Sequence, residues 1–309
     1  MDRARTARTA RAARGEAVKK RRAPLARRAP RAPLDQSGAR SDGQLVALWL
    51  AGRPETTRSG YARELRWWAV PSLAALRLAD VVARLDAAPS CAPATTARRV
   101  AALRSLLSFG HRVGYLAVNI GAVLRPVRQL DRLSERILDP EQVLALLAAA
   151  RAAPREGERD HALVRFLYSS AARVSEALGL TWEAVHRQAD GAAVTLHGKG
   201  SRTRAVWISE GTARELLALP RLGPSVFSSS RGARLAVRDA QRIVTRAAAR
   251  AGLGAVSPHW MRHAHATHAL ERGAPVHVVA ADLGHASVGT TTRYLHARPG
   301  TGSASWLAL

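Results

Sequence analysis

The sequence is poor in cysteine, aromatic residues and long apolar runs, and each shortage excludes something. The single cysteine, Cys91, excludes an intramolecular disulfide and a thiolate metal cluster, and it fits a reducing compartment. Aromatic residues make up only 5% of the chain, so Ala and Leu fill the apolar positions, which favours helices over sheet. No apolar run is long enough to span a bilayer, and none follows the first basic residues as in a secretory signal, so we expect neither.

Acidic residues are also scarce. There are 23 Asp and Glu against 48 Lys and Arg, which gives a formal net charge of +25 and a pI of about 11.7. A surface this positive repels itself unless it meets a polyanion, so DNA or RNA is the expected partner. Composition alone leaves two alternatives open: an anionic membrane surface, and GC-rich coding that raises the Arg and Ala content without a function.

The length of 309 residues suggests one large domain or two ordinary ones. Residues 1–40 form a basic arm rich in Arg, Ala and Pro, which has almost nothing to build a core and is expected to be disordered on its own. Residues 41–127 have helical periodicity and form a first domain. Residues 128–137 form a linker, and residues 138–309 form a second domain.

The first domain is predicted to be all-helical with one basic side. Ser41 is a candidate N-cap, and the clearest helix covers residues 95–114, where apolar residues recur at helical spacing. Arg98, Arg99 and Arg104 fall outside that apolar stripe. We therefore expect these three arginines to face outward and to contact DNA.

The second domain is predicted to be helical around one β-hairpin. The motif DPEQ at residues 139–142 predicts a capping box, and a later helix is expected to run unbroken over residues 159–179. Two short β-prone runs, residues 193–196 and 205–208, flank GKGS and predict a hairpin with Lys199 at its tip. Further helical segments follow, so the expected fold class is mainly α with a small β-sheet (α+β).

The segment SPHWMRHAHATHAL carries the clearest chemical signal. His259 and Arg262 share a helix face, and His263 lies one turn beyond His259. A guanidinium beside an imidazole suits a phosphate, because Arg keeps its charge while His exchanges a proton near neutral pH. The spacing of the two histidines also occurs in zinc sites, but no cysteine or nearby carboxylate completes one, so no metal is expected. His265 and His268 fall on other faces, where packing or a surface role is expected.

Three other signals are weaker when taken singly. Arg173 lies in an apolar helical run, and Glu176 is placed to pair with it. Lys199 lies in a glycine-flanked hairpin tip that could reach a phosphate. His285 and Tyr294 lie nine residues apart near the end of the sequence. Each has an ordinary alternative: an intrahelical ion pair, a solvated lysine and a tail aromatic.

Together these residues closely resemble the tyrosine recombinase (phage integrase) family. Four segments carry the resemblance: ARVSEALGLTW, HGKGSRTRAVWIS, PHWMRHAHATHALERG and LGHASVGTTTRYLH. More loosely, it extends over residues 41–127. The sequence differs from the family pattern at three positions. Ala171 stands where the family often has Gly, Met261 where Leu is usual, and His265 where an aromatic residue is common. The resemblance implies a two-domain clamp, with a helical core-binding (SAM-like) domain and a C-terminal catalytic domain.

The resemblance also implies an activity, the cutting and rejoining of DNA by transesterification without a cofactor. Tyr294 would attack phosphorus to form a 3′-phosphotyrosine and free a 5′-hydroxyl, with His259 as the expected base. Arg173 and Arg262 would grip the non-bridging oxygens of the phosphate.

The remaining positions of the motif have supporting tasks in this scheme. His285 would donate a hydrogen bond to the phosphate, and Lys199 would protonate the leaving 5′-oxygen, which Arg cannot do. Glu176 and His263 would orient the reacting groups.

The expected partner is double-stranded DNA with specific recombination sites, bound by four protomers at synapsis in the cytoplasm at the nucleoid, with no membrane. Arg202 and Arg204 in the hairpin are further expected DNA contacts. Two alternatives remain: a catalytically silent DNA-binding or architectural relative, and a type IB topoisomerase-like relaxing enzyme. The motifs do not choose among integration, excision, dimer resolution and transposition, nor between Tyr294 acting in its own site or a neighbour's.

Overall fold

The computed structural model describes residues 34–88, 91–126, 136–198, 202–285, 287–292 and 294. The chain divides into two compact units, with the boundary between residues 130 and 131. The predicted arm up to residue 33 and the predicted linker up to residue 135 lie outside the described residues. Lys199, at the predicted hairpin tip, and the C-terminal residues 295–309 also lie outside them.

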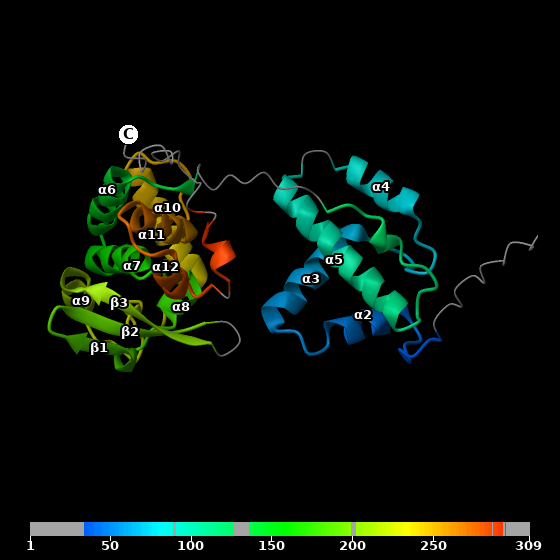
Figure 1. The fold of residues 1–309 in the computed structure, drawn as a ribbon, viewed down its shortest axis with the longest axis horizontal. Coiled ribbons are helices and arrows are strands. Elements are labelled where there is room, and N and C mark those ends of the chain that lie inside the picture. Colours follow the sequence, from blue (N-terminus) through cyan, green and yellow to red (C-terminus); the bar gives the residue numbers. More distant parts are fainter. Residues whose placement is uncertain are drawn as a thin grey trace, which may run out of the picture. The chain divides into compact units, whose positions relative to one another are not determined.

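The regular elements in the described residues of the first unit are all helices (Figure 1). Ser41 caps its first helix as expected, because its side chain accepts a hydrogen bond from the backbone N–H of Gln44. The core runs along the longest helix, where Leu103, Leu106 and Leu107 are almost fully buried. The elements are α2 (Asp42–Leu50), α3 (Glu55–Trp68), α4 (Leu78–Asp86), α5 (Pro93–Arg112) and the 3-10 turn η1 (Ile120–Ala122).

One arginine of α5 is turned inward. The Arg99 side chain is only 15% exposed and lies 3.8 Å from the buried carboxylate of Glu64. Its guanidinium lies over the ring of Trp67, 3.9 Å from the centroid, and donates to Cys91 Sγ at 2.7 Å. The expectation that Arg99 faces outward is therefore wrong, because a buried Glu needs a cation close by. Its neighbour Arg98 has a side chain that is 60% exposed.

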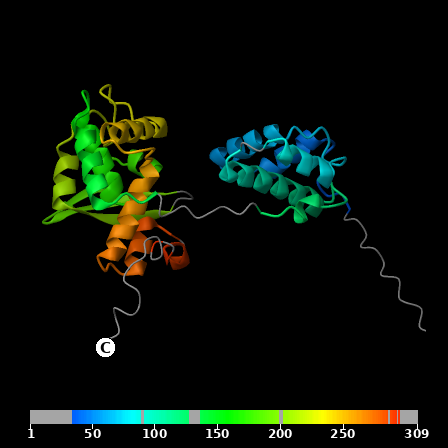
Figure 2. The same ribbon diagram turned by 90° about the horizontal axis from the view of Figure 1, so that it is seen from above.

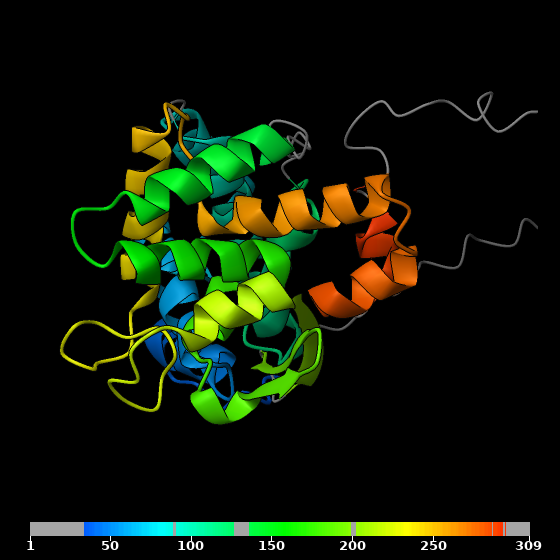
Figure 3. The same ribbon diagram turned by 90° about the vertical axis from the view of Figure 1, so that its left-hand side faces the viewer.

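The second unit surrounds one central helix, α7 (Gly157–Ser169). Figure 3 shows α7 between α11 and α9, and both helices contact it. In Figure 2 the chain passes from α10 through α11 to α12 and η4, drawn from yellow to red. The other elements are α6 (Pro140–Arg151), α8 (Val174–Leu178), η3 (Trp182–Ala184), β1 (Val185–Gln188), β2 (Gly191–His197), β3 (Thr203–Ser209), α9 (Glu210–Leu217), α10 (Val237–Arg250), α11 (Pro258–Glu271), α12 (Val276–Leu283) and η4 (Val288–Thr290).

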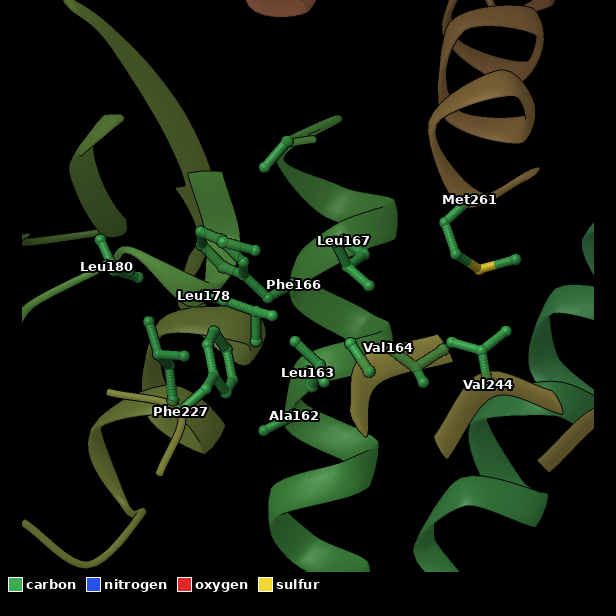
Figure 4. Close-up of a cluster of buried hydrophobic side chains, with 14 of the residues drawn as sticks. Ala162, Leu163, Val164, Phe166, Leu167, Leu178, Leu180, Phe227, Val244 and Met261 are labelled. Carbon is green, nitrogen blue, oxygen red and sulfur yellow. The ribbon is translucent and has the colours of Figure 1, made fainter. Parts of the chain in front are cut away.

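The core of this unit has α7 at its centre (Figure 4). Phe166 faces Phe227 with ring centroids 5.7 Å apart, while Val164 points toward Val244 and Met261 on the other side. A helix buried on several sides must be apolar on several sides, which is why α7 shows no simple amphipathic stripe. The expected capping box at the start of α6 is present: Gln142 N donates to Asp139 Oδ1 at 2.8 Å, and Asp139 N donates to Gln142 Oε1 at 3.0 Å.

The sheet has three antiparallel strands in the order β1-β2-β3. The expected hairpin is β2–β3, whose last pair before residues 199–201 is His197 with Thr203. Strand β1 was not predicted, because its four residues are largely exposed and have no alternating pattern. One face of the sheet is buried and the other is open to solvent. The expected fold class, mainly α with a small sheet, is confirmed.

The helix predicted over residues 159–179 is broken. It ends at Ser169 as α7, and α8 begins only at Val174. Between them Ala171 has a φ of +52°, a left-handed conformation that a helix does not allow and that Gly adopts more easily. The break places Arg173 before the first turn of α8 rather than within an apolar helix.

In the described part of the chain, none of the helices has both the length and the apolar character needed to cross a membrane.

Candidate active site

Five of the six predicted reactive residues meet at one cavity of about 180 Å³. They come from three places in the chain: the start of α8, the first turns of α11, and the segment after α12. Lys199, the sixth, is outside the described residues. The cavity is lined by Arg173, His259, Arg262, His263, His285, Thr290 and Tyr294.

Arg173 is held by Glu176 through two hydrogen bonds. Its backbone N–H donates to Glu176 Oε2 at 2.8 Å, and its Nη1 donates to Glu176 Oε1 at 2.8 Å. The Glu176 side chain is 2% exposed, whereas that of Arg173 is 43% exposed. The carboxylate therefore holds both the backbone and one Nη of Arg173, while the rest of the guanidinium stays accessible to a ligand in the cavity.

Arg262 is the most deeply buried of the cationic residues, with 2% exposure. It donates Nη1 to the carbonyl of Ala171 at 2.7 Å and Nη2 to the carbonyl of Leu283. Burial, together with the charges of Arg173 and Arg204, lowers the pKa of Arg262 to about 10. The residue therefore stays charged at neutral pH.

The two histidines of α11 have different partners. His263 Nδ1 lies 2.8 Å from the hydroxyl of Tyr294, and both side chains are buried. The His259 ring packs edge-on against His263, with centroids 4.3 Å apart. Partial burial, and then the charges of Arg262 and Arg173, lower the pKa of His259. Sequence reasoning expected His259 to be the group beside Tyr294, but the imidazole within hydrogen-bond distance is that of His263.

His285 follows the C-cap of α12, Gly284. Gly284 turns the chain there with a φ of +60°, a conformation that favours glycine. The Nδ1 of His285 lies 2.8 Å from the hydroxyl of the fully buried Thr291. Burial, followed by the charges of Arg262, Arg173 and Arg204, lowers the pKa of His285 to about 4, so the ring is neutral at pH 7.

A second, more open groove of about 590 Å³ adjoins this cavity and shares Arg173 and His285 with it. The hairpin lines its other side through Gly198, Arg202 and Arg204. Arg202 is exposed, in keeping with a DNA contact, but Arg204 points inward.

Arg204 is a predicted DNA contact whose guanidinium the structure pairs with protein acceptors. It donates Nη2 to Glu176 Oε2 at 2.7 Å and Nε to the carbonyl of Asp282 at 2.8 Å. A signal was available, because side chains alternate along a strand and Arg204 therefore shares a face with the buried Val206 and Ile208.

The other histidines of α11 pack away from the cavity. His265 Nδ1 lies 2.7 Å from the carbonyl of Tyr168, and His268 Nδ1 lies 2.9 Å from the Tyr168 hydroxyl. A packing role for both fits the expectation. Within the described residues, no group of three or more His, Cys, Asp or Glu side chains is arranged to hold a metal ion.

In the first unit, the expected DNA contacts of α5 divide into two kinds. Arg104 lines a groove of about 570 Å³ with Ser105, Ser108 and Asn119, and Arg98 is exposed beside Glu64. Polar side chains in a groove next to a cation suit a phosphate backbone. Arg99, as described above, serves the core instead.

Comparison with known proteins agrees with the geometry of the site. Residues 136–300 match the phage integrase family. The chain is 36% identical over 215 residues to the tyrosine recombinase XerD of Mycobacterium tuberculosis, covering 65% of this chain and 68% of the relative. It is 33% identical over 279 residues to the tyrosine recombinase XerC of Mycobacterium leprae, covering 79% of this chain and 89% of the relative.

The fold has close counterparts among solved structures. One is a lambda integrase tetramer bound to a Holliday junction, which superposes with a TM-score of 0.69 at 17% identity, over 82% of this chain and 75% of the other. The match to the family covers more than half of the chain. The chain therefore belongs to the phage integrase family and is a tyrosine-type site-specific DNA recombinase.

Proposed function

We propose that this recombinase cuts and rejoins DNA through Tyr294, using the cavity between α8, α11 and η4 as its active site. One observation carries the proposal. The Tyr294 hydroxyl lies within hydrogen-bond distance of the His263 imidazole, in a cavity that Arg173, Arg262 and His285 also line. A phenol, a proton acceptor and two guanidiniums are what an attack on a phosphodiester requires.

The arrangement of the two hollows supports an in-line displacement. Tyr294 lies in the smaller cavity, the hairpin lines the larger groove, and Arg173 and His285 belong to both. A phosphate at this shared boundary has the nucleophile on one side and the hairpin on the other. Attacking and leaving oxygens on opposite sides of phosphorus are the geometry of phosphoryl transfer.

The Tyr294 oxygen bonds to phosphorus, its proton passes to His263, and the bond from phosphorus to the 5′-oxygen breaks. Lys199, adjacent in sequence to Gly198 at the groove, gives its proton to the departing 5′-oxygen. The product is a 3′-phosphotyrosine that keeps the energy of the broken bond, so rejoining needs no ATP.

The neutral state of His285 suits it for the oxygens of the phosphate. In the tautomer with its proton on Nε2, Nδ1 accepts from Thr291 and the Nε2–H is a donor. His259 lies beside Arg262 on the same helix face and completes the set of donors. Removing one such preorganised donor slows the catalysed step on the order of 10²–10³-fold.

The partner is double-stranded DNA with specific sites, and four protomers assemble on two sites during exchange. The charge of +25, the family relationship and the tetramer formed by lambda integrase support this assembly. The place of action we propose is the cytoplasm, at the nucleoid, where such a substrate lies. All five of the predicted reactive residues that the structure describes line one cavity. We therefore favour an active recombinase over a catalytically silent architectural relative.

A covalent-adduct experiment tests the proposal. Duplexes that the protein binds are selected from a randomised pool and rebuilt as nicked substrates whose cleaved end diffuses away. Wild type should form a denaturation-resistant protein–DNA adduct, and Tyr294→Phe should form none.

An adduct that persists in Tyr294→Phe would reassign the nucleophile, and no adduct with wild type would support the silent relative. Strand exchange between two selected sites, as opposed to relaxation of supercoiled DNA alone, would exclude a type IB topoisomerase-like enzyme.

A further inference from the structure

Arg204 is a half-buried arginine to which the mechanism above gives no task. Its side chain is 14% exposed, and the two hydrogen bonds described above go to Glu176 and to the carbonyl of Asp282. These bonds turn its guanidinium into the protein. Because these two acceptors take its Nε and Nη2 donors, the guanidinium connects Glu176 to the end of α12.

One end of this connection is the carboxylate of Glu176. It accepts from the backbone and the guanidinium of Arg173 as well as from Arg204. It also lies close to the end of the hairpin, because a Cβ added to Gly198 would lie 3.1 Å from Glu176 Oε1. Glu176 therefore joins the phosphate-binding arginine to the strand end that precedes Lys199.

The other end of the connection is the C-terminus of α12. The carbonyl of Asp282 accepts from Arg204, and the next carbonyl, of Leu283, accepts from Arg262. Two cations thus satisfy consecutive carbonyls at the negative end of one helix. His285 follows two residues later, so the end of α12 sets where its ring lies.

We propose that Arg204 is a positioning residue for DNA cleavage, which holds Arg173 and His285 at a fixed separation by bridging Glu176 to the end of α12. The proposal rests on the proposed function of the same site. Reacting groups must be held closely, since a misplacement of about 1 Å costs on the order of 10²-fold in rate. Arg204 touches neither the nucleophile nor the cavity that holds it.

The first test compares Arg204→Met with Arg187→Met. Arg187 is a matched control, because it lies in the same sheet and donates to Glu210 at 2.7 Å, but on the surface. On the selected nicked duplex, Arg204→Met should form the covalent adduct about 10²-fold more slowly at saturating protein. Arg187→Met should react at the wild-type rate, and both variants should bind the duplex as tightly as wild type.

The second test separates positioning from general damage to the fold. A methylphosphonate at the cleaved position removes the negative charge that Arg173 neutralises. If Arg204 acts by placing Arg173, the loss caused by Arg204→Met should shrink to less than about 10-fold on this substrate, because the interaction it supports is no longer needed. An equal loss on both substrates would overturn the proposal.

A double-mutant cycle covers the case in which Arg204→Met folds poorly. Arg204→Lys keeps the charge but not the forked geometry, and it should retain an intermediate rate. Combined with Glu176→Gln, it should slow the reaction no further than Glu176→Gln alone, since the bridge is already broken. Additive losses would contradict the bridge, whereas an inactive wild type would contradict the proposed function instead.

Discussion

At the scale of single residues, the contact between His263 and Tyr294 underlies our proposal for how the proton of the nucleophile is handled. A phenol has an ordinary pKa of about 10, so it needs an acceptor in the transition state. His259 and His263 are one turn apart on α11, and it is His263 whose Nδ1 lies 2.8 Å from the Tyr294 hydroxyl, while His259 packs against the ring of His263. This favours a division of labour in which His263 serves the tyrosine and His259 serves the phosphate.

Fluorinated tyrosine at position 294 tests that division. His263→Gln should slow adduct formation by roughly 10²–10⁴-fold, the usual worth of a general base. Difluorotyrosine ionises at lower pH, so at neutral pH it should restore much of the rate lost in His263→Gln. His259→Gln should gain little from the same replacement. Rescue of His259→Gln in place of His263→Gln would reverse the assignment.

At the scale of elements, the short helix α8 depends on its neighbours. Five residues are too few to form a stable helix alone, so packing and end contacts must hold it. Glu176, in the first turn of α8, provides such an end contact, because its carboxylate accepts from the backbone N–H of Arg173. Burial raises the pKa of its carboxyl, but hydrogen bonds from Arg204 and Arg173 outweigh burial and hold that pKa at about 2.

The depressed pKa predicts how stability depends on pH. A carboxyl with a pKa of about 2 in the folded state and 4.5 otherwise stabilises the fold fully above pH 4.5, and this stabilisation is lost as pH falls toward 2. Glu176→Gln should therefore lower the free energy of unfolding of the second unit by about 3 kcal/mol near pH 7. Denaturant titrations at several pH values should show the gap between the two proteins closing below pH 4.5.

Glu141→Gln is the control for that measurement, because Glu141 is exposed in the first turn of α6 and its removal should cost no more than about 1 kcal/mol. A gap between wild type and Glu176→Gln that stays constant from pH 7 to pH 2 would show that the carboxylate is not held by its arginines.

At the scale of the whole molecule, charge governs the encounter with DNA. The net charge of +25 is spread over both units and the first 33 residues, of which 12 are Lys or Arg. Each phosphate that is neutralised releases counterions, so affinity falls linearly on a log–log plot against salt. Charge of this kind speeds and strengthens binding but does not read sequence.

Binding titrations from 50 to 200 mM salt test this view. Affinity of the full chain for duplex DNA should fall by about 10³-fold or more over this range if six or more phosphates are contacted. A chain that begins at Leu34 should show a shallower slope but form the covalent adduct on a nicked duplex at the same rate. A slope unaffected by the truncation would show that the basic arm makes no phosphate contacts.

The sequence by itself determined the chemistry and the class of fold. Reactive side chains are a matter of residue type and order, and the box around Arg262 and the interval from His285 to Tyr294 are readable without a structure. Helical periodicity and the GKGS hairpin likewise depend on neighbours a few residues apart. These local signals predicted an α-rich fold with a small sheet and a phosphate-cleaving site.

Only the tertiary structure decided which of several similar side chains meet. Three features depend on partners far along the chain: the break at Ala171, the inward turn of Arg99 and Arg204, and the contact of Tyr294 with His263. A buried carboxylate such as that of Glu64 or Glu176 pairs with an arginine that the fold brings close, because burying an unpaired charge costs too much free energy. Which arginine is close enough to pair depends on the folded structure, and the order of residues in the sequence does not show it.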